Sequence, residues 1–578
     1  MELNLAGGEH VKIPTSVGQF HVPYIWIKDE GFLMRQAAPR VEEMAKKGYS
    51  VLEALERFKA KGLVFPPHEP VVETFYKKIL DLEKQGKNGI WGRFLKNVFA
   101  PMIAGKFNKF DFVVGNPPWI RWDFLSQEYR EATLQLWKDY GLFSLRGFET
   151  RLGGAKKDFS MLFTFTVSDH YLKDGAKLGF LITQEVFKSK GAGEGFRRFK
   201  LGEHGNNLKV LKAHDFVSLQ PFEGAANKTA AIILTKGEET TYPVPYFIWK
   251  KKRGLGRIST DKTYDEVKPL LQMRKFYAQP IGSKRGAWQT LPEKQKNLNL
   301  IEGKNVYQAR SGAYTSPYGV FWVNVEQVLS NGNLIISNLA EKWKRVISKI
   351  RETIEPDLVF PAIRGSDIKR WNAMPGIHVL ITQDPIKRVG YEEQIMKQKW
   401  PRTFGYLLRF KESLLAQAAY KKYHAESDNP FYSQYNIAKY TFSNYKVIWK
   451  QMSNDLVAAV ISQIKTPLGY KCIVPLHTTA LIASDNENEA HFLCAIINSK
   501  PVRNFIRSFS SAGRGFGTPC VMNHVRIPKF DPKDKLHQKL TRLSKTLHEL
   551  VQNNKLEDVP HWEKEVDQAV RTLFGMES

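Results

Sequence analysis

The stretch Phe110-Asp-Phe-Val-Val-Gly-Asn-Pro-Pro-Trp119 decides the fold that this sequence predicts. Its first five residues are apolar except for one aspartate, which indicates a short strand. The glycine and the double proline that follow can continue neither a strand nor a helix, so the chain turns sharply there. Open α/β sheets bind their ligands at the carboxyl ends of strands, and Asn116 and the carbonyl of Pro117 are expected at such an end.

These residue types suit the recognition of an amino group on an aromatic ring. The Asn116 side-chain oxygen and the Pro117 carbonyl are two acceptors that can hold the two hydrogens of an exocyclic amine, while Pro117 and Pro118 fix the backbone. Trp119 offers a flat face for stacking a base that has been flipped out of a duplex. The alternative is that Asn-Pro-Pro-Trp is only a rigid turn at the end of a strand.

The longer string, with Phe-Asp-x-Val-x-Gly before Asn116, resembles the motif of amino-group methyltransferases that use S-adenosyl-L-methionine. Asparagine in the first position is similar to the adenine-N6 enzymes, whereas the cytosine-N4 enzymes more often begin with serine. The resemblance implies that Asn116, Pro117, Pro118 and Trp119 are the catalytic residues. It implies direct methyl transfer, with no covalent enzyme intermediate.

The resemblance continues along the chain. Lys157-Asp-Phe-Ser160 followed by Leu178-Gly-Phe-Leu-Ile-Thr183 is similar to a helix and strand of the large bacterial N6-adenine DNA methylases, and implies that Asp158 lies near the target pocket. Phe222-Glu-Gly-Ala-Ala-Asn-Lys-Thr229 resembles the loop whose aromatic residue contacts the flipped base from the side opposite the catalytic motif. Phe222 is therefore the second candidate, with an ordinary core phenylalanine as the alternative.

The cofactor part of that family is only weakly represented. Its glycine-rich loop, similar to Asp-Pro-x-x-Gly-Ser-Gly, is not found, because Leu5-Ala-Gly-Gly8 has neither a strand before it nor a helix after it. The acidic end of a strand over Val22–Asp29 is a weak candidate for contacting the cofactor, and Asp111 and Gly115 are two more. The resemblance thus implies an N-terminally incomplete sheet and a second protein subunit that carries the missing loop.

The charge of the chain indicates a polyanionic partner. Lys and Arg number 86 against 58 Asp and Glu, for a net charge of +28. Residues 1–250 carry 36 basic and 28 acidic residues, whereas residues 251–578 carry 50 and 30. Blocks such as Lys250, Lys251, Lys252 and Arg253 predict binding of double-stranded DNA, although a solvated surface is the alternative.

Other features exclude several classes of protein. No apolar stretch approaches the roughly 18–20 residues that span a bilayer, and the first residues do not resemble a signal peptide, so we expect a cytoplasmic protein without membrane contact. Cys472, Cys494 and Cys520 are too far apart for a paired metal or redox motif, and we expect neither a metal site nor a disulfide framework.

The order of elements predicts an α/β fold. Helical spacing in 39–60, 67–84 and 158–173, and apolar runs in 177–183, 210–216 and 229–235, predict helices that alternate with strands of a mostly parallel, Rossmann-like methyltransferase sheet. In the second half, helices are expected in 335–352, 405–422, 487–508 and 534–553. The expected divisions are a catalytic region (1–245), a basic linker (246–300), an α+β target-recognition domain (301–530) and a C-terminal helical region (531–578).

The second half also carries a resemblance. Phe360–Trp371, Lys446–Trp449 and Phe492–Lys500 are similar to segments of target-recognition domains in type IIG restriction-modification and phage-defence systems. This implies that Arg364, Lys369 and Arg370 contact DNA, although each could be a surface charge.

The sequence therefore predicts a site-specific adenine-N6 DNA methyltransferase subunit. Two alternatives remain open. One is a non-catalytic DNA-binding specificity or scaffold subunit, and the other is a methyltransferase for RNA or for protein glutamine.

Overall fold

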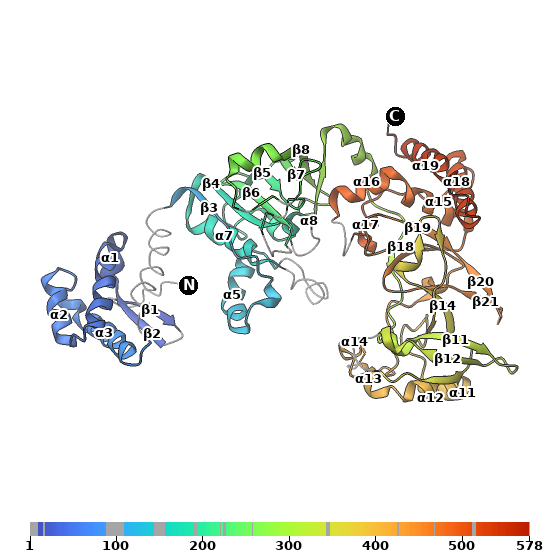
Figure 1. The fold of residues 1–578 in the computed structure, drawn as a ribbon, viewed down its shortest axis with the longest axis horizontal. Helices are drawn as coiled ribbons and strands as arrows, with labels where there is room; N and C mark the ends of the chain where they lie inside the picture. The colour runs from blue at the N-terminus through green and yellow to red at the C-terminus, as the bar shows by residue number, and fades with distance from the viewer. Residues whose placement is uncertain are drawn as a thin grey trace. The chain divides into compact units, whose positions relative to one another are not determined.

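The computed structural model describes residues 10–15, 18–87, 109–143, 157–188, 193–219, 221–222, 227–256, 258–259, 261–342, 347–424, 427–467, 469–510 and 516–576 (Figure 1). The chain divides into two compact units. The first contains Met1–Gln184 and Phe199–Gln272, and the second contains Glu185–Arg198 and Met273–Ser578.

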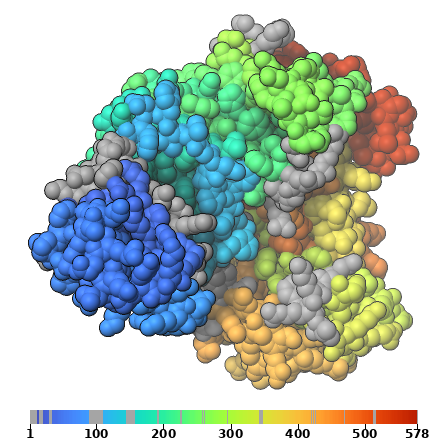
Figure 2. Space-filling model, turned by 60° about the vertical axis from the view of Figure 1, so that its left-hand side comes forward, coloured from blue at the N-terminus to red at the C-terminus, as the bar shows by residue number. Residues whose placement is uncertain are grey.

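Residues 10–87 form a hairpin and three helices with a core of their own, drawn in blue in Figure 2. The elements are β1 (His10–Thr15), β2 (Gly18–Pro23), α1 (Tyr24–Lys46), α2 (Val51–Ala60) and α3 (Glu69–Lys84). Ser50 caps α2, because its hydroxyl accepts the Glu53 N–H while the Glu53 carboxylate accepts the Ser50 N–H. The helices expected in 39–60 and 67–84 are confirmed, with a break before Ser50.

The structure corrects the prediction for Asp29. The strand β2 ends at Pro23, and residue 29 lies inside α1 rather than at the end of a strand. Trp26, Met34, Ala37 and Val41 recur at helical spacing and are buried in the core. This periodicity outweighs the apolar run that suggested a strand.

Five strands form the mixed sheet of the first unit, in the order β3-β4-β6-β5-β7 (Figure 1). They are β3 (Phe110–Gly115), β4 (Leu172–Thr183), β5 (Leu208–Asp215), β6 (Thr229–Lys236) and β7 (Val244–Lys251). Pairs β3–β4 and β5–β7 are parallel, but β6 runs antiparallel to both β4 and β5. The α/β class is confirmed, and β3, β4, β5 and β7 run in one direction, as expected for a mostly parallel sheet, with β6 as the reversed strand.

Two helices of the first unit come after the loop that follows β3 in the chain. They are α5 (Gln127–Asp139) and α7 (Phe159–His170). The helix α7 packs against β4 and buries Met161, Leu162 and Phe165, so the helix expected in 158–173 is confirmed.

The second unit contains two larger sheets, a six-stranded one in the order β13-β12-β11-β17-β14-β22 and a four-stranded one in the order β10-β23-β18-β19. The strands are β8 (Leu271–Pro280), β9 (Trp288–Leu291), β10 (Arg310–Ser311), β11 (Trp322–Val328), β12 (Leu334–Asn338), β13 (Arg351–Ile354), β14 (Val359–Ile363), β15 (Ile368–Lys369), β16 (Asn372–Ala373), β17 (Ile377–Leu380), β18 (Tyr445–Lys450), β19 (Ala458–Ile461), β20 (Gln463–Thr466), β21 (Gly469–Cys472), β22 (Val474–Pro475) and β23 (Thr479–Ser484).

Helices cover these sheets and connect them. The α-helices are α8 (Glu185–Lys188), α10 (Tyr318–Phe321), α11 (Glu393–Lys399), α12 (Pro401–Leu408), α13 (Lys411–Leu415), α14 (Ala418–Tyr423), α15 (Glu487–Asn498), α16 (Lys500–Phe509), α17 (Pro519–Met522), α18 (Lys535–Gln552) and α19 (Val559–Leu573); the short α9 (Tyr264–Val267) belongs to the first unit. The helices expected in 405–422, 487–508 and 534–553 are confirmed.

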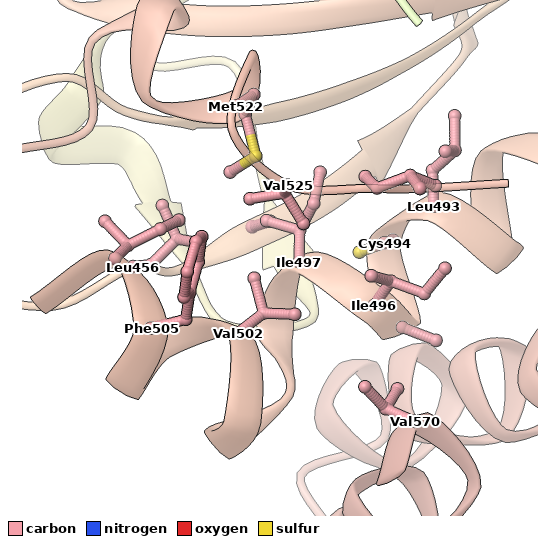
Figure 3. Close-up of a cluster of buried hydrophobic side chains, with 14 of the residues drawn as sticks. Leu456, Leu493, Cys494, Ile496, Ile497, Val502, Phe505, Met522, Val525 and Val570 are labelled. Carbon is pink, nitrogen blue, oxygen red and sulfur yellow. The ribbon is translucent and has the colours of Figure 1, made fainter. Parts of the chain in front are cut away.

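The main core of the second unit lies between α15, α16 and the helices α18 and α19 (Figure 3). Leu493 and Ile497 of α15, Val502 and Phe505 of α16 and Val570 of α19 all belong to this core. Lys535–Gln552 and Val559–Leu573 are therefore helices, as the helical pattern after residue 531 predicts, and they share their core with the rest of this unit.

Two expectations for the second half differ from the structure. Residues 335–352 were expected to be helical, but Leu334–Asn338 and Arg351–Ile354 are paired antiparallel strands. Leu334 and Ile336, two residues apart, are buried, and their strand lies between two neighbouring strands. The expected linker 246–300 contains most of β7 and all of β8 and β9. Among the described residues, no helix is both long enough and apolar enough to cross a membrane.

Candidate active site

Strand direction brings several loops to one edge of the first unit's sheet. The parallel strands β3 and β4 end at Gly115 and Thr183. The strand β6 begins at Thr229, which pairs with Thr183, and β5 ends beside the start of β6 at Asp215. Because β6 runs opposite to β4 and β5, the loop after β3, the loop after β4 and the loop before β6 all meet this edge. Open sheets of this class bind ligands there.

The loop after β3 carries the predicted catalytic residues. Asn116 and Pro118 are exposed, Pro117 is buried and Trp119 is half-buried. The Trp119 Nε1 donates a hydrogen bond to the Leu181 carbonyl oxygen at 3.2 Å, which attaches the loop to the end of β4. Asn116 is thus held on a fixed loop while its amide stays accessible to a substrate.

Trp119 and Phe222 come together from loops 100 residues apart in the chain, but not as a sandwich. Their ring centroids are 5.1 Å apart and the rings are inclined by 80°, an edge-to-face contact. A base stacked between two parallel rings needs about 6.8 Å, twice the roughly 3.4 Å stacking distance. The expected sandwich is therefore not present, and the two rings form one aromatic wall instead.

Asp158 lies beside the same loop but acts as a helix cap. Its carboxylate accepts the backbone N–H of Ser160 at 2.9 Å, at the start of α7, and the residue is buried. The Phe159 N–H donates to the Ile120 carbonyl at 2.8 Å, and residues 121 and 158 form a β-bridge. Asp158 therefore ties the start of α7 to the chain immediately after Trp119.

The three predicted cofactor residues do not form a cofactor site. Residue 29 lies within α1, and Asp111 forms an exposed ion pair with Lys173 at 2.9 Å. Asp111 precedes Asn116 by five residues, about 16 Å along a strand, so it lies away from the carboxyl edge. Gly115 is explained by packing, since an added Cβ would lie 3.1 Å from the Phe180 ring. These three residues thus do not form a site that fits S-adenosyl-L-methionine.

A buried polar cluster at this edge was missed by the sequence analysis. The Asp215 carboxylate accepts hydrogen bonds from the Tyr246 hydroxyl at 2.7 Å and from the Gln184 Nε2 at 3.1 Å. Burial, and then the charge of Asp215, raise the pKa of Tyr246 well above its usual value, so its hydroxyl stays protonated and donates. Within the part of the chain that the structure describes, the buried Gln184 Oε1 and Thr183 Oγ1 have no hydrogen-bond partner. In the sequence, part of this cluster could have been recognised from the polar pair Thr183 and Gln184 at the end of a buried strand.

The strand β3 is an edge strand among the described residues, with β4 as its neighbour. Alternate residues Phe110, Phe112 and Val114 are 44%, 72% and 83% exposed, and alternation places them on one face. Large apolar side chains on an open edge mark a surface for another strand or for aggregation.

The predicted DNA-binding residues differ in their surroundings. Lys250, Lys252 and Arg253 are exposed, whereas Lys251 is half-buried and its Nζ donates to the Gly256 carbonyl at 3.0 Å. Lys250 and Lys251 are the last two residues of β7, and Lys252 and Arg253 follow it directly.

In the second unit, the Arg364 guanidinium donates to both carboxylate oxygens of Asp367, each at 2.9 Å. Arg370 donates to Asp455 at 2.8 Å and to Glu563 at 3.4 Å, whereas Lys369 is exposed. Both arginines are therefore engaged by carboxylates of the same chain.

Comparison with known proteins adds an independent observation. Residues 53–222 match the model of the Eco57I restriction-modification methylase family, a range that contains all the predicted catalytic and base-contacting residues. The Type II methyltransferase M.MjaIV of Methanocaldococcus jannaschii is 23% identical over 229 residues, which are 38% of this chain and 70% of that protein. The predicted resemblance to restriction-modification methylases is confirmed, and the matches support a DNA methyltransferase.

Two solved structures show a limited likeness over most of the chain. The Type IIL restriction-modification enzyme MmeI in complex with DNA is 11% identical with a TM-score of 0.46, over 81% of this chain and 55% of that one. The type IIG restriction endonuclease BpuSI is 12% identical with a TM-score of 0.24, over 80% of this chain and 54% of that one. This chain thus spans about half the length of each enzyme.

Proposed function

We propose that this chain, whose residues 53–222 match the Eco57I restriction-modification methylase family, is the catalytic and DNA-recognising subunit of a site-specific adenine-N6 DNA methyltransferase. One observation carries the proposal. An exposed asparagine and a buried proline follow β3 at the carboxyl edge of the sheet, beside the aromatic wall of Trp119 and Phe222.

The chemistry follows from the groups on this loop. The Asn116 side-chain oxygen and the Pro117 carbonyl accept the two hydrogens of the adenine amine, which directs the nitrogen lone pair away from the ring plane. The aromatic wall stacks the flipped base on one side. S-adenosyl-L-methionine would supply the methyl group: the bond between the amine nitrogen and the methyl carbon would form as the sulfonium–methyl bond breaks, and the amine would release one proton to solvent. None of the three cysteines is needed as a nucleophile.

The methyl donor in the proposal is S-adenosyl-L-methionine, and a second subunit holds it. The three predicted cofactor residues do not form a site for the donor, and the open edge of β3 leads directly to Asn116. A parallel strand added to this edge would end beside Asn116 and place its own side chains next to those of Phe112 and Val114 on the same face of the sheet. We therefore assign to the partner subunit the glycine-rich loop that follows such a strand.

The basic second half supports duplex DNA as the substrate, because sequence-specific binding needs a large positive surface. Host marking in restriction-modification or phage defence, in the cytoplasm, is the corresponding biological role. The poor fit of the three predicted cofactor residues to the donor also supports a second candidate, a non-catalytic DNA-binding specificity or scaffold subunit.

Product analysis tests the proposal. The chain is expressed together with the proteins encoded next to it, and DNA, RNA and protein hydrolysates are analysed by mass spectrometry. We expect N6-methyladenine in DNA, which is absent when this chain is omitted. N4-methylcytosine, or methylation confined to RNA or to protein glutamine, would contradict the assigned substrate, and no product at all would favour the scaffold.

A further inference from the structure

A basic recess in the second unit lies outside the residues matched by the methylase family. Its volume is about 260 Å³, which corresponds to about nine water molecules at roughly 30 Å³ each. The residues that line it are Arg310, Pro385, Ile386, Arg388, Ala438, Lys439 and Tyr440. Three of these side chains are cationic and none is acidic.

Three separate segments bring the cations together. Arg310 lies on β10, and its guanidinium carbon is 4.9 Å from the centroid of the Tyr440 ring, a cation–π arrangement. Lys439 precedes Tyr440 in a 3-10 helix (Lys439–Phe442). Arg388 belongs to the turn that follows residue 384. Within the described part of the chain, neither Arg388 nor Lys439 forms an ion pair.

The turn that carries Arg388 is constrained. The Asp384 carboxylate accepts the backbone N–H groups of Ile386 and Lys387 at 2.7 and 3.0 Å, and the Arg388 N–H donates to the Asp384 carbonyl at 2.9 Å. Arg388 has a φ of 60°, in the left-handed region that non-glycine residues rarely adopt. A residue held in this strained conformation at the wall of a recess indicates a functional constraint.

The two guanidinium groups act on the same phenol. Burial raises the pKa of Tyr440, while the charges of Arg310 and Arg388 oppose that rise. Positive charges that converge without a counter-ion repel one another, and a bound anion removes that cost.

We propose that this recess binds one phosphodiester group of the backbone of the DNA substrate. Pro385, Ile386 and Ala438 line the same recess, and Ile386 is 70% exposed, so an apolar surface lies beside the cations. A phosphate joined to a sugar fills both kinds of surface, whereas free phosphate uses only the cations. The identity of the polymer as DNA rests on the proposed function.

Salt-dependent DNA binding by the full chain tests this assignment. Arg388→Ala and Lys439→Ala remove cations from the recess, and Lys387→Ala is the matched control, because Lys387 does not line the recess and pairs with Glu392 at 2.7 Å. Fluorescence anisotropy with a labelled duplex is recorded between 50 and 200 mM salt. In each recess variant, the slope of log affinity against log salt should become less steep by about 0.9. The factor by which the variant binds DNA more weakly than the wild type should therefore become about 3.5-fold smaller between 50 and 200 mM salt. The control should keep the wild-type slope.

Equal slopes and affinities for Arg388→Ala and Lys387→Ala, with tight binding by the wild type, would overturn the recess assignment. A parallel calorimetric titration with inorganic phosphate and AMP identifies the source of the phosphate. If inorganic phosphate or AMP binds to the wild type but not to Arg388→Ala, and DNA binding is the same in both proteins, the assignment of the recess to DNA would also be overturned. These binding experiments do not depend on methyl transfer. A failure of the proposed catalytic function would be detected by the product analysis and not by these experiments.

Discussion

Replacement of Gly115 by alanine should reduce methyl transfer while leaving the fold almost unchanged. An added Cβ would lie 3.1 Å from Cε1 of Phe180, closer than the 3.4–4 Å of ordinary contacts, so either the Phe180 ring or the backbone at residue 115 must shift by a few tenths of an ångström. We expect this shift to fall on the backbone. Gly115 immediately precedes Asn116, and a misplacement of about 1 Å costs about 100-fold in rate. A shift of about 0.3 Å on that scale predicts a loss of about fourfold.

The stability of this variant should change by less than about 1 kcal/mol. Alanine restricts the unfolded chain and gains about 0.4–1 kcal/mol where the backbone allows it, which offsets the tight contact. Gly179→Ala is the matched control. Its Cβ would lie 3.7 Å from Val114 Cγ1, an ordinary contact on the neighbouring strand.

The assay compares initial rates of methyl incorporation into DNA for both variants in the assembled complex, with thermal unfolding measured in parallel. We expect a slower Gly115→Ala enzyme, a Gly179→Ala enzyme at the wild-type rate, and partial recovery when Phe180→Leu accompanies Gly115→Ala. Equal rates for the two alanine variants would refute the link between the packing of Gly115 and the position of Asn116.

Two further predictions concern the edge of β3 and a buried lysine. Phe112→Asp should abolish association with the partner subunit in light-scattering measurements. Leu52→Asp is the control, since Leu52 is 71% exposed and Phe112 is 72% exposed, and it should not affect association. Equal behaviour of the two variants would contradict a contact at the edge of β3. Burial lowers the pKa of Lys446 to about 8 from its usual 10.5, so between these values the unfolded chain binds more protons and stability rises with pH. In urea titrations, the free energy of unfolding of the wild type should rise by about 3 kcal/mol relative to that of Lys446→Met between pH 8 and pH 10.5. If the free energies of unfolding of the two proteins change in parallel with pH, Lys446 is not the group responsible.

Local patterns in the sequence predicted much of the first unit. The apolar run before Asn116 and the prolines after it placed β3 and its loop correctly, and the strands β4, β5 and β6 follow from similar runs. The direction of β6 was not predictable in this way, because a run such as Thr229–Thr235 has the same pattern in parallel and antiparallel sheets.

In the candidate site, too, local sequence predicted individual residues but not the contacts between residues that are far apart in the chain. The proximity of Trp119 and Phe222 followed from the resemblance, but their edge-to-face contact depends on the packing of loops 100 residues apart. The cluster joins Asp215 at the end of β5, Tyr246 within β7 and Gln184 directly after β4, so no single stretch of sequence reveals it. The sequence predicted that Arg370 is a DNA contact or a surface charge. Its ion pairs with Asp455 and Glu563 could not be predicted, because these residues lie far from Arg370 in the chain.

The most direct test of the central claim replaces Asn116 by alanine in the assembled complex. Asn227→Ala is the control, since Asn227 is also exposed and lies in the loop before β6 at the same edge. We predict that Asn116→Ala abolishes N6-methyladenine formation and leaves DNA affinity within about twofold of the wild type, since phosphate contacts dominate affinity. Undiminished N6-methyladenine in Asn116→Ala would contradict the claim that this loop performs the methyl transfer.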